Sequence, residues 1–124
     1  MVDILMRAGK DIADLEGWDD EKEEIPCFRG NKPTDEPKWV YFILNGEIKG
    51  RAEYIDYRDA KVSENIQGEA MEDMAFIVKG LLIKPSNNIE VPKNILRGRW
   101  LWRYIEDSPK FEGLNKEIMK SFKG

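Results

Sequence analysis

Residues 38–57 read KWVYFILNGEIKGRAEYIDY, and this stretch decides the fold. Six consecutive apolar residues lead into Asn45-Gly46, and an alternating run of apolar and charged residues follows. Asparagine and glycine both tolerate the positive φ that a two-residue type I′ turn requires, so the pattern predicts a β-hairpin. The turn also predicts the register, in which the following pairs lie opposite each other: Leu44 and Glu47, Ile43 and Ile48, Tyr41 and Gly50, Trp39 and Ala52.

This register gives the two faces of the hairpin different polarity. One face is apolar throughout and is predicted to lie in the core; it carries Trp39, Tyr41, Ile43, Ile48, Gly50, Ala52 and Tyr54. On the other face the first strand is apolar and the second is charged, so we expect the first strand to be buried on both faces and the second on one. Because Gly50 and Ala52 are small residues opposite aromatic ones, the sheet is expected to curve tightly there, as at the corner of a small barrel.

The length and composition predict a single domain. With 124 residues, 41% of them hydrophobic, the chain can form an ordinary core, and we expect one domain over residues 1–124 with its barrel at about 38–106. The one cysteine, Cys27, cannot form an internal disulfide, and no apolar run approaches the ~20 residues of a membrane-spanning helix. The first residues do not match a signal peptide, so we expect a cytoplasmic protein with no membrane partner.

The charges are unevenly distributed along the chain. The formal net charge is -4, with 11 acidic and 5 basic residues in 1–37 but 5 acidic and 8 basic residues in 85–124. An acidic protein is not a typical general binder of nucleic acid, although a local basic strip can still contact a phosphate chain. The C-terminal third is therefore where we look for such a strip.

Before the hairpin, the spacing of apolar residues in 2–16 predicts an amphipathic helix, and residues 17–24 form an acidic, solvated segment. Residues 25–37 contain three prolines and are predicted to be an ordered loop. Loops of this length are often functional, and this one brings together Cys27, Phe28, Arg29 and Lys32. The alternative is that Ile25 and Phe28 simply hold the loop to the core.

After the hairpin, residues 58–73 are polar and are predicted to be a short helix or an irregular crossover. Residues 74–84 predict a buried strand that is bent or bulged at Gly80. A short strand is expected at 89–92, and a longer one at 94–105, with Trp100, Trp102 and Tyr104 on one face and Arg99, Leu101, Arg103 and Ile105 on the other. Asp107-Ser108-Pro109 predicts the start of a closing helix whose apolar residues are Leu114, Ile118, Met119 and Phe122.

The residue types exclude several kinds of chemistry. There is no histidine, which removes the commonest acid-base catalyst and the commonest metal ligand. One cysteine cannot build a zinc site, and the glycines lack the spacing of a phosphate-binding loop. We therefore expect no cofactor and no metal, and we consider an enzyme less favoured than a binding domain.

The most informative polar pattern lies between Lys93 and Tyr104, where basic residues alternate with aromatic ones and no acidic residue occurs. Guanidinium groups can bind phosphates while aromatic rings stack on bases. Alternatively, the aromatic residues are core and the cations cover an edge strand. On the first interpretation, the binding residues are Phe28, Arg29, Lys93, Arg97, Arg99, Trp100, Trp102 and Arg103.

The hairpin with its phrase NGEIKGRA, the apolar strand AFIVKGLLIK and the basic strand GRWLWRYIE together resemble the PUA-like superfamily, which includes ASCH and EVE domains. This resemblance covers about residues 38–106. It implies an α+β fold, a small mixed or antiparallel pseudo-barrel with flanking N- and C-terminal helices, and a cleft that binds RNA or modified bases. Some ASCH relatives hydrolyse an acetylated cytidine with a lysine, a threonine and a glutamate, but the one threonine here is Thr34.

We therefore expect a nucleic-acid or modified-nucleotide binding domain, with RNA or another single-stranded nucleic acid as partner. The alternatives are a protein-interaction module that does not touch nucleic acid and a small ASCH-like nucleoside amidohydrolase. The sequence leaves open the oligomeric state, and also whether Trp100 and Trp102 lie in the core or line the cleft.

Overall fold

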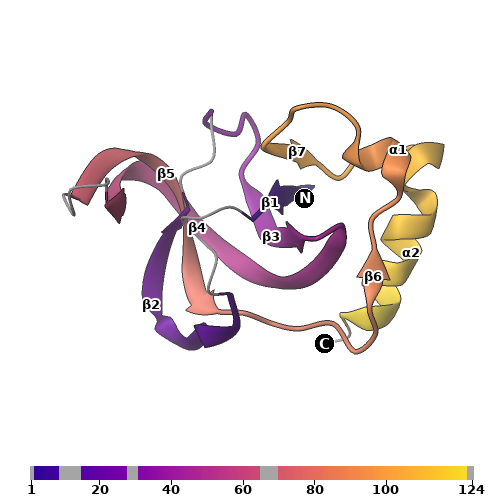
Figure 1. Cartoon of the computed structure of the whole chain (residues 1–124), viewed down its shortest axis with the longest axis horizontal. Helices are drawn as coiled ribbons and strands as arrows, with labels where there is room; N and C mark the ends of the chain where they lie inside the picture. Colours follow the sequence, from indigo (N-terminus) through magenta and orange to yellow (C-terminus); the bar gives the residue numbers. More distant parts are fainter. Residues whose placement is uncertain (1, 9–14, 28–30, 65–69, 123–124) are drawn as a thin grey trace.

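The computed structural model describes residues 2–8, 15–27, 31–64 and 70–122. Within them, seven strands form one mixed sheet with short helices near the C-terminus, so the fold is α+β as the sequence predicts (Figure 1). The elements are β1 (Val2–Arg7), β2 (Asp19–Cys27), β3 (Pro37–Leu44), β4 (Glu47–Glu64), β5 (Ala70–Leu81), β6 (Ile89–Glu90), α1 (Lys93–Leu96), β7 (Trp102–Tyr104) and α2 (Glu112–Ser121), with 3-10 turns at Leu15–Gly17 and Pro109–Phe111. The strand order is β2-β5-β4-β3-β1-β7, and β6 pairs with β4.

The N-terminal segment forms a strand, so the helix predicted over residues 2–16 is wrong. β1 pairs in parallel with β3 and antiparallel with β7. Ile4, Leu5 and Met6 are each 0% exposed, because a strand between two others inside the domain is covered on both faces. The adjacency of these three apolar residues is the sequence signal for such a strand, whereas the spacing of the apolar residues over 2–16 indicates a helix. Residues 9–14 lie outside the described residues.

The predicted hairpin is confirmed at its turn. Asn45 and Gly46 have φ values of 54° and 77°, and the pairs Leu44–Glu47 and Ile43–Ile48 lie opposite each other. Beyond them the register changes, because Phe42 lies opposite Gly50 and leaves Lys49 as an extra residue in β4. The predicted pairs Tyr41–Gly50 and Trp39–Ala52 are therefore wrong. The observed partners are Arg51 for Tyr41 and Glu53 for Trp39.

This β-bulge divides the predicted apolar face between two cores. Tyr41, Ile43 and Ile48 lie in one core, together with Leu5 and the buried residues of α2. Val40, Phe42 and Ala52 lie in the other, so β3 is buried on both faces, as predicted. Tyr54 packs against this second core, away from Tyr41, because the extra residue reverses the alternation of side chains along β4.

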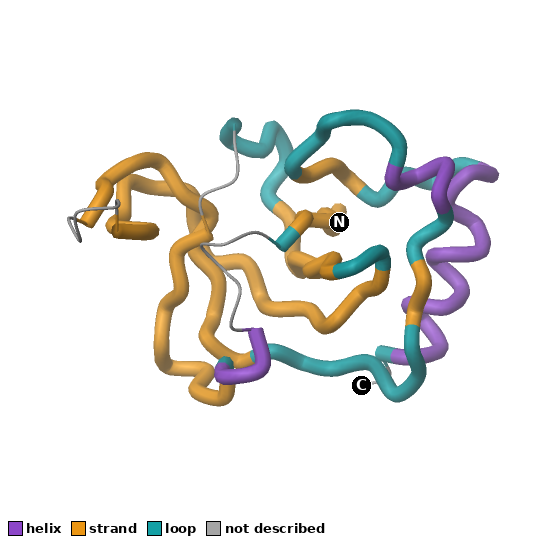
Figure 2. Tube along the Cα trace, in the orientation of Figure 1, coloured by secondary structure: helices purple, strands orange, loops and turns teal. Residues whose placement is uncertain are grey.

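β4 is much longer than predicted and connects two parts of the sheet (Figure 2). Its first part pairs with β3, and its second part, from Tyr54 onward, pairs with β5. The short helix or irregular crossover predicted for 58–73 is therefore wrong in the described residues, which continue as strands; residues 65–69 are outside them. The buried strand predicted at 74–84 is confirmed by Ala75, Phe76, Ile77 and Val78.

The acidic segment is exposed, as predicted, and most of it forms a strand. Asp19, Asp20 and Glu24 belong to β2, which pairs with β5. The irregularity expected at Gly80 occurs in the partner strand, where residues 21–23 are extra between the pairs Asp20–Gly80 and Glu24–Lys79. A Cβ on Gly80 would lie 2.8 Å from the Asp20 carbonyl oxygen. Residues 25–27, predicted as the start of a loop, belong to β2 instead.

The closing helix is confirmed, and three of its four predicted apolar residues are buried. Pro109 begins a 3-10 turn that continues into α2, and Leu114, Ile118 and Phe122 pack into the core. Met119 is 78% exposed, so its predicted burial is wrong. α2 stands beside β6 at one side of the sheet (Figure 1).

The predicted barrel is not closed by hydrogen bonds, since the two end strands of the described sheet, β2 and β7, do not pair with each other. The sheet nevertheless curls strongly. The ring centroids of Trp102, in β7, and Phe76, in β5, lie 5.4 Å apart. Because β7 is at one end of the strand order and β5 is next to the other end, side chains rather than backbone connect these strands.

The close approach of residues 82 and 83 to Gly50 can be tested by substitution. A Cβ at this position would lie 2.6 Å from Leu82 Cγ and 3.0 Å from the carbonyl oxygen of Ile83. We expect Gly50→Ala to lower the free energy of unfolding by roughly 1–3 kcal/mol, measured by urea denaturation. Gly113→Ala is the control, because nothing lies within 4 Å of the Cβ that this substitution adds and alanine favours the helix. Equal stability of the two variants would contradict the tight crossing at Gly50.

Candidate nucleic-acid interface

The basic and aromatic segment is not one strand, so the strand predicted at 94–105 is wrong in its first half. Lys93–Leu96 form α1, the chain bends through Gly98 at a φ of 95°, and only Trp102–Tyr104 form β7. The predicted face shared by Trp100, Trp102 and Tyr104 is also wrong for Trp100. Trp100 packs against the core that contains α2, whereas the other two rings pack against the core that contains Phe76.

Residues 97–101, here called the basic loop, are held in place by Arg7 at the end of β1. The Arg7 guanidinium donates hydrogen bonds to the carbonyl oxygens of Leu96 and of Gly98, the latter at 3.2 Å. It also lies 4.2 Å from the centre of the Trp100 ring, and the Arg7 backbone N–H donates to the Leu101 carbonyl at 3.0 Å. The loop conformation is therefore fixed by the sheet.

Trp100 anchors the same loop from within. Its indole N–H donates to the carbonyl oxygens of Ile95 at 3.1 Å and Arg97 at 3.0 Å. The guanidinium of Arg103 lies 5.7 Å from the Trp100 ring and 5.1 Å from the Phe111 ring. Arg103 also forms an ion pair with Glu106 at 3.5 Å. Trp100 and Arg103 thus have structural contacts in addition to their partial exposure.

Two shallow depressions adjoin the basic loop. One, of about 270 Å³, is lined by Asn31, Trp100, Leu101 and Trp102. The other, of about 340 Å³, is lined by Trp100, Trp102, Arg103, Tyr104 and Glu106. Both tryptophans line both depressions. Each tryptophan packs against a core and also borders an accessible hollow, so both are partly core and partly surface residues.

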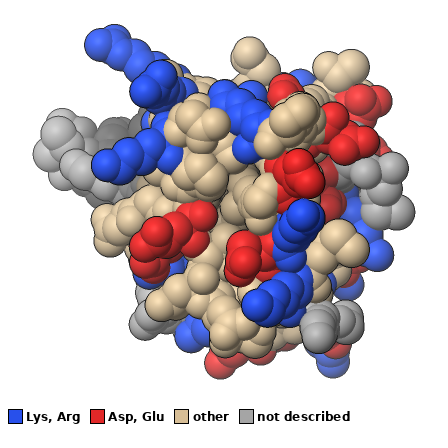
Figure 3. All heavy atoms as spheres, turned by 90° about the vertical axis from the view of Figure 1, so that its right-hand side faces the viewer, with Lys and Arg blue, Asp and Glu red and all other residues tan. Residues whose placement is uncertain are grey.

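The cations of the candidate site divide into two groups. Lys93, Arg97 and Arg99 are exposed, and within the described part of the chain none of them forms an ion pair. Arg103 is partly buried and paired. On the side of the molecule that carries α1 and α2, Lys and Arg side chains gather at one upper corner, while acidic and basic side chains alternate elsewhere (Figure 3). The unpaired cations are the ones suited to contact a phosphate.

The loop before β3 contributes less than the sequence suggested. Phe28 and Arg29 lie outside the described residues, so their role as binding residues stays a prediction. Cys27 is fully buried in the core, and Lys32 is exposed. Asn31, which the sequence analysis did not select, lines the depression beside Trp102 and brings this loop to the candidate site.

Sequence reasoning also missed a group of aromatic residues on β4. Tyr54 and Tyr57 contact the buried ring of Phe76 edge to face, with centroid distances of 6.2 Å and 5.3 Å. Trp102 contacts the same ring, so the β4 tyrosines lie near β7. Their places in the chain, 45 or more positions from Trp102, give no local signal of this proximity.

The phenol of Tyr54 has an unusual environment. Burial, followed by the carboxylates of Glu36 and Asp56 and the phenols of Tyr104 and Tyr57, raises its pKa from 10.0 to about 12. Each of these neighbours disfavours an additional negative charge. Glu36 and Asp56 thus place acidic groups near Tyr54, whereas the basic loop carries two arginines.

The described residues contain no group of three or more His, Cys, Asp or Glu side chains that could hold a metal ion. Among the described helices, none has the length and apolar character needed to cross a membrane. Comparisons with protein-family models, curated proteins and solved structures find no match for this chain. The site must therefore be interpreted from its own residues.

The role of Arg7 can be tested by removing its charge and its hydrogen-bond donors. We expect Arg7→Met to lower the free energy of unfolding by roughly 1–3 kcal/mol, because two carbonyl groups lose a charged donor. Fluorescence quenching should also show a more accessible Trp100. Lys93→Met is the control, because it removes an exposed cation and should change stability by less than about 0.5 kcal/mol. Equal effects would show that Arg7 does not hold the loop.

The raised pKa of Tyr54 predicts a loss of stability at alkaline pH. The unfolded chain releases this proton near pH 10.0, whereas the folded protein retains it to about 12. The contribution of the raised Tyr54 pKa to the free energy of unfolding is thus fully present below pH 10.0 and is lost as the pH rises toward 12. Chemical denaturation between these values should show a steeper fall for the wild type than for Tyr54→Phe. Parallel curves would contradict the assigned environment.

Proposed function

We propose that this protein binds single-stranded nucleic acid, with RNA as the main candidate, through the surface formed by α1, the basic loop and β7. The observation that carries the proposal is that the exposed Arg97 and Arg99 belong to the same short loop as Trp100, which lines two depressions together with Trp102. The exposed Lys93 precedes this loop in α1 and lines a separate depression with Glu47 and Glu90. Cations can neutralise phosphates there, and the indole rings can stack on bases.

The fixed conformation of the basic loop supports this proposal. Arg7 and Trp100 hold the carbonyl groups of residues 95–98, so the loop backbone is ordered before any ligand arrives. Ordering a loop during binding costs free energy, and a preformed loop avoids much of that cost. The short spacing of Arg97 and Arg99 on this loop suits contacts to neighbouring phosphates of a flexible strand.

We also retain the PUA-like pseudo-barrel as a proposal for the fold family. It is supported by the strong curl of the sheet, in which β5 and β7 meet through Phe76 and Trp102. A cleft beside such a curled sheet is where the resemblance expects RNA or a modified base. The depressions next to Trp102 are our candidates for this cleft.

A protein-interaction module is the second candidate, because one apolar side chain in the loop is open to solvent. Leu101 is 50% exposed and lines a depression together with both tryptophans. An exposed leucine beside aromatic residues suits an apolar partner. By contrast, the amidohydrolase alternative gains no support from Thr34, which is exposed, or from Lys79, whose pKa is raised by a hydrogen bond with Glu53 rather than lowered as a nucleophile requires.

The salt dependence of binding tests the proposal. A fluorescent single-stranded RNA should bind at low salt, and Arg97→Ala/Arg99→Ala should weaken binding and flatten the plot of log affinity against log salt by about 1.4 units, since each lost phosphate contact removes about 0.7. The control Lys116→Ala/Lys120→Ala removes the same charge from α2 and should leave the slope nearly unchanged. Both doubles should keep the wild-type melting temperature because all four side chains are exposed.

Two results would decide against this proposal. Equal slopes for the two double variants would show that general charge, not the basic loop, attracts the RNA. No binding of RNA or DNA at low salt by the wild-type protein would exclude a nucleic-acid function and leave the interaction module.

A further inference from the structure

Four partly exposed aromatic rings come together where the sheet curls. Tyr54, Tyr57 and Trp102 contact the buried Phe76 ring, at interplanar angles of 68°, 76° and 72°. Tyr104 contacts Trp102 at 89° with the centroids 5.1 Å apart. We call Tyr54, Tyr57, Trp102 and Tyr104 the aromatic junction. It joins β4 to β7, two strands that are far apart in the strand order.

The loop before β3 closes one edge of this junction. The backbone N–H of Asp35 donates to the Tyr104 hydroxyl at 2.9 Å, and the hydroxyl donates to the Asp35 carbonyl at 3.1 Å. This pair of bonds fixes the Tyr104 ring and holds the following residue, Glu36, near the junction. The carboxylate of Glu36 accordingly acts on the phenol of Tyr54.

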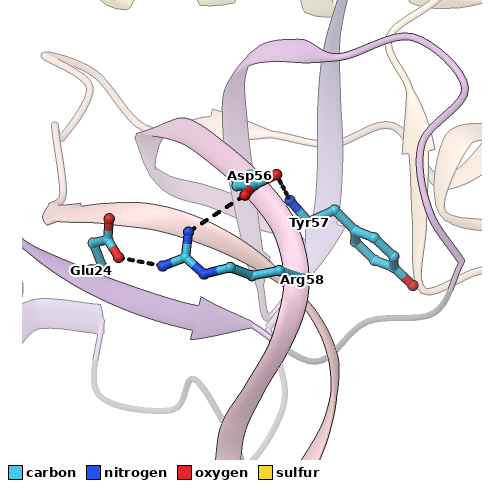
Figure 4. A network of polar contacts seen from close by, with 4 residues as sticks. All are labelled: Glu24, Asp56, Tyr57 and Arg58. Atoms are coloured by element: carbon cyan, nitrogen blue, oxygen red, sulfur yellow. Dashed lines mark hydrogen bonds and ion pairs between the residues drawn. The ribbon is translucent and has the colours of Figure 1, made fainter.

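The other neighbouring carboxylate, that of Asp56, has a different role. It accepts a hydrogen bond from the Tyr57 backbone N–H at 2.7 Å and pairs with Arg58 at 3.5 Å. Arg58 also pairs with Glu24 of β2. Figure 4 shows the Tyr57 ring pointing away from this network. In the described structure Glu36 forms no ion pair, so its charge is the one available to a ligand at the junction.

Aromatic faces beside an unpaired carboxylate favour a positive charge. The face of an aromatic ring carries a negative potential, which attracts cations within about 6 Å of the ring centre. The two carboxylates that act on the Tyr54 phenol, those of Glu36 and Asp56, are both negative. A neutral base could stack on these rings and donate an N–H to Glu36, but it would lack the charge–charge attraction that a cationic base gains there.

We propose that the aromatic junction binds a cationic nucleobase, that is, a purine or pyrimidine whose ring carries a positive charge because a ring nitrogen is methylated. This inference rests on the proposed nucleic-acid function and deepens it. A delocalised ring cation satisfies both features of the junction, because it stacks like any base and its charge is balanced by Glu36.

Trp102 connects this junction to the phosphate-binding surface. It belongs to the junction and also lines the depressions beside the basic loop. A nucleotide placed across Trp102 would direct its phosphates toward Arg97 and Arg99 and its base toward Tyr54 and Glu36. The cations of the basic loop would then contact the negative phosphates, and the carboxylate of Glu36 would lie near the positive base of the same ligand.

Two probes with isomeric bases test the role of the ring charge. A short single-stranded RNA with one central 1-methyladenosine carries a ring cation, whereas the same RNA with N6-methyladenosine has the same methyl group on a neutral base. We expect wild type to bind the cationic probe roughly tenfold more tightly. Glu36→Gln should reduce the preference to less than about threefold while preserving side-chain shape, and Tyr54→Leu should reduce it through loss of a ring.

The control variants separate this inference from the proposed function. Arg97→Ala/Arg99→Ala should weaken binding of both probes by a similar factor and keep the preference, and Tyr54→Phe should also keep it because the ring remains. Equal affinity of wild type for the two probes, or an unchanged preference in a folded Glu36→Gln protein, would overturn the cationic-base inference but leave RNA binding intact. Failure of both probes to bind would overturn both proposals.

Discussion

The structure depends on a single crossing, where the chain after β5 passes over β4 at Gly50. The bulged residue Lys49 precedes this crossing, and backbone hydrogen bonds join Arg51 to Ile83 in both directions, at 2.9 Å and 2.8 Å. A side chain at residue 50 would overlap Leu82. From this crossing the chain continues to β6, α1 and β7, so the position of the candidate site depends on backbone contacts to β4 as well as on the pairing of β7 with β1.

The same bulge places Arg51 where it connects the sheet to α2. Its guanidinium donates to the Tyr41 hydroxyl at 3.1 Å and lies 4.0 Å from the centre of the Trp39 ring and 4.9 Å from that of Phe122. A cation stacked between two rings contributes packing as well as charge. Trp39, predicted as a core residue, is only partly buried: its ring packs against the core that contains α2 and also stacks with the Arg51 guanidinium.

Short sequence patterns predicted the turns and helix ends that depend on interactions between neighbouring residues. Asn45-Gly46 fixed the turn, and Ser108-Pro109 marked the beginning of the closing helix. The bulge at Lys49 and the strand character of β1 were not predicted, because each depends on partners far away in sequence. The candidate site shows the same division. Lys93, Arg97 and Arg99 were visible in the sequence as a cluster of charge, whereas Arg7 and Tyr54 reach the site only through the folding of the sheet.

An acidic chain can present a basic loop because electrostatic attraction is local. The acidic strand β2 lies at the lower left of Figure 1, and the segment joining α1 to β7 lies at the upper right, at the opposite end of the strand order. At physiological ionic strength, charges on the surface are screened over about 8 Å, so the residues nearest a ligand determine its local potential. In the proposed complex, the phosphates lie toward Arg97 and Arg99 of the basic loop, and the base lies toward the carboxylate of Glu36. Such an arrangement would select a ligand by the order of its charges, which a uniformly basic surface cannot do.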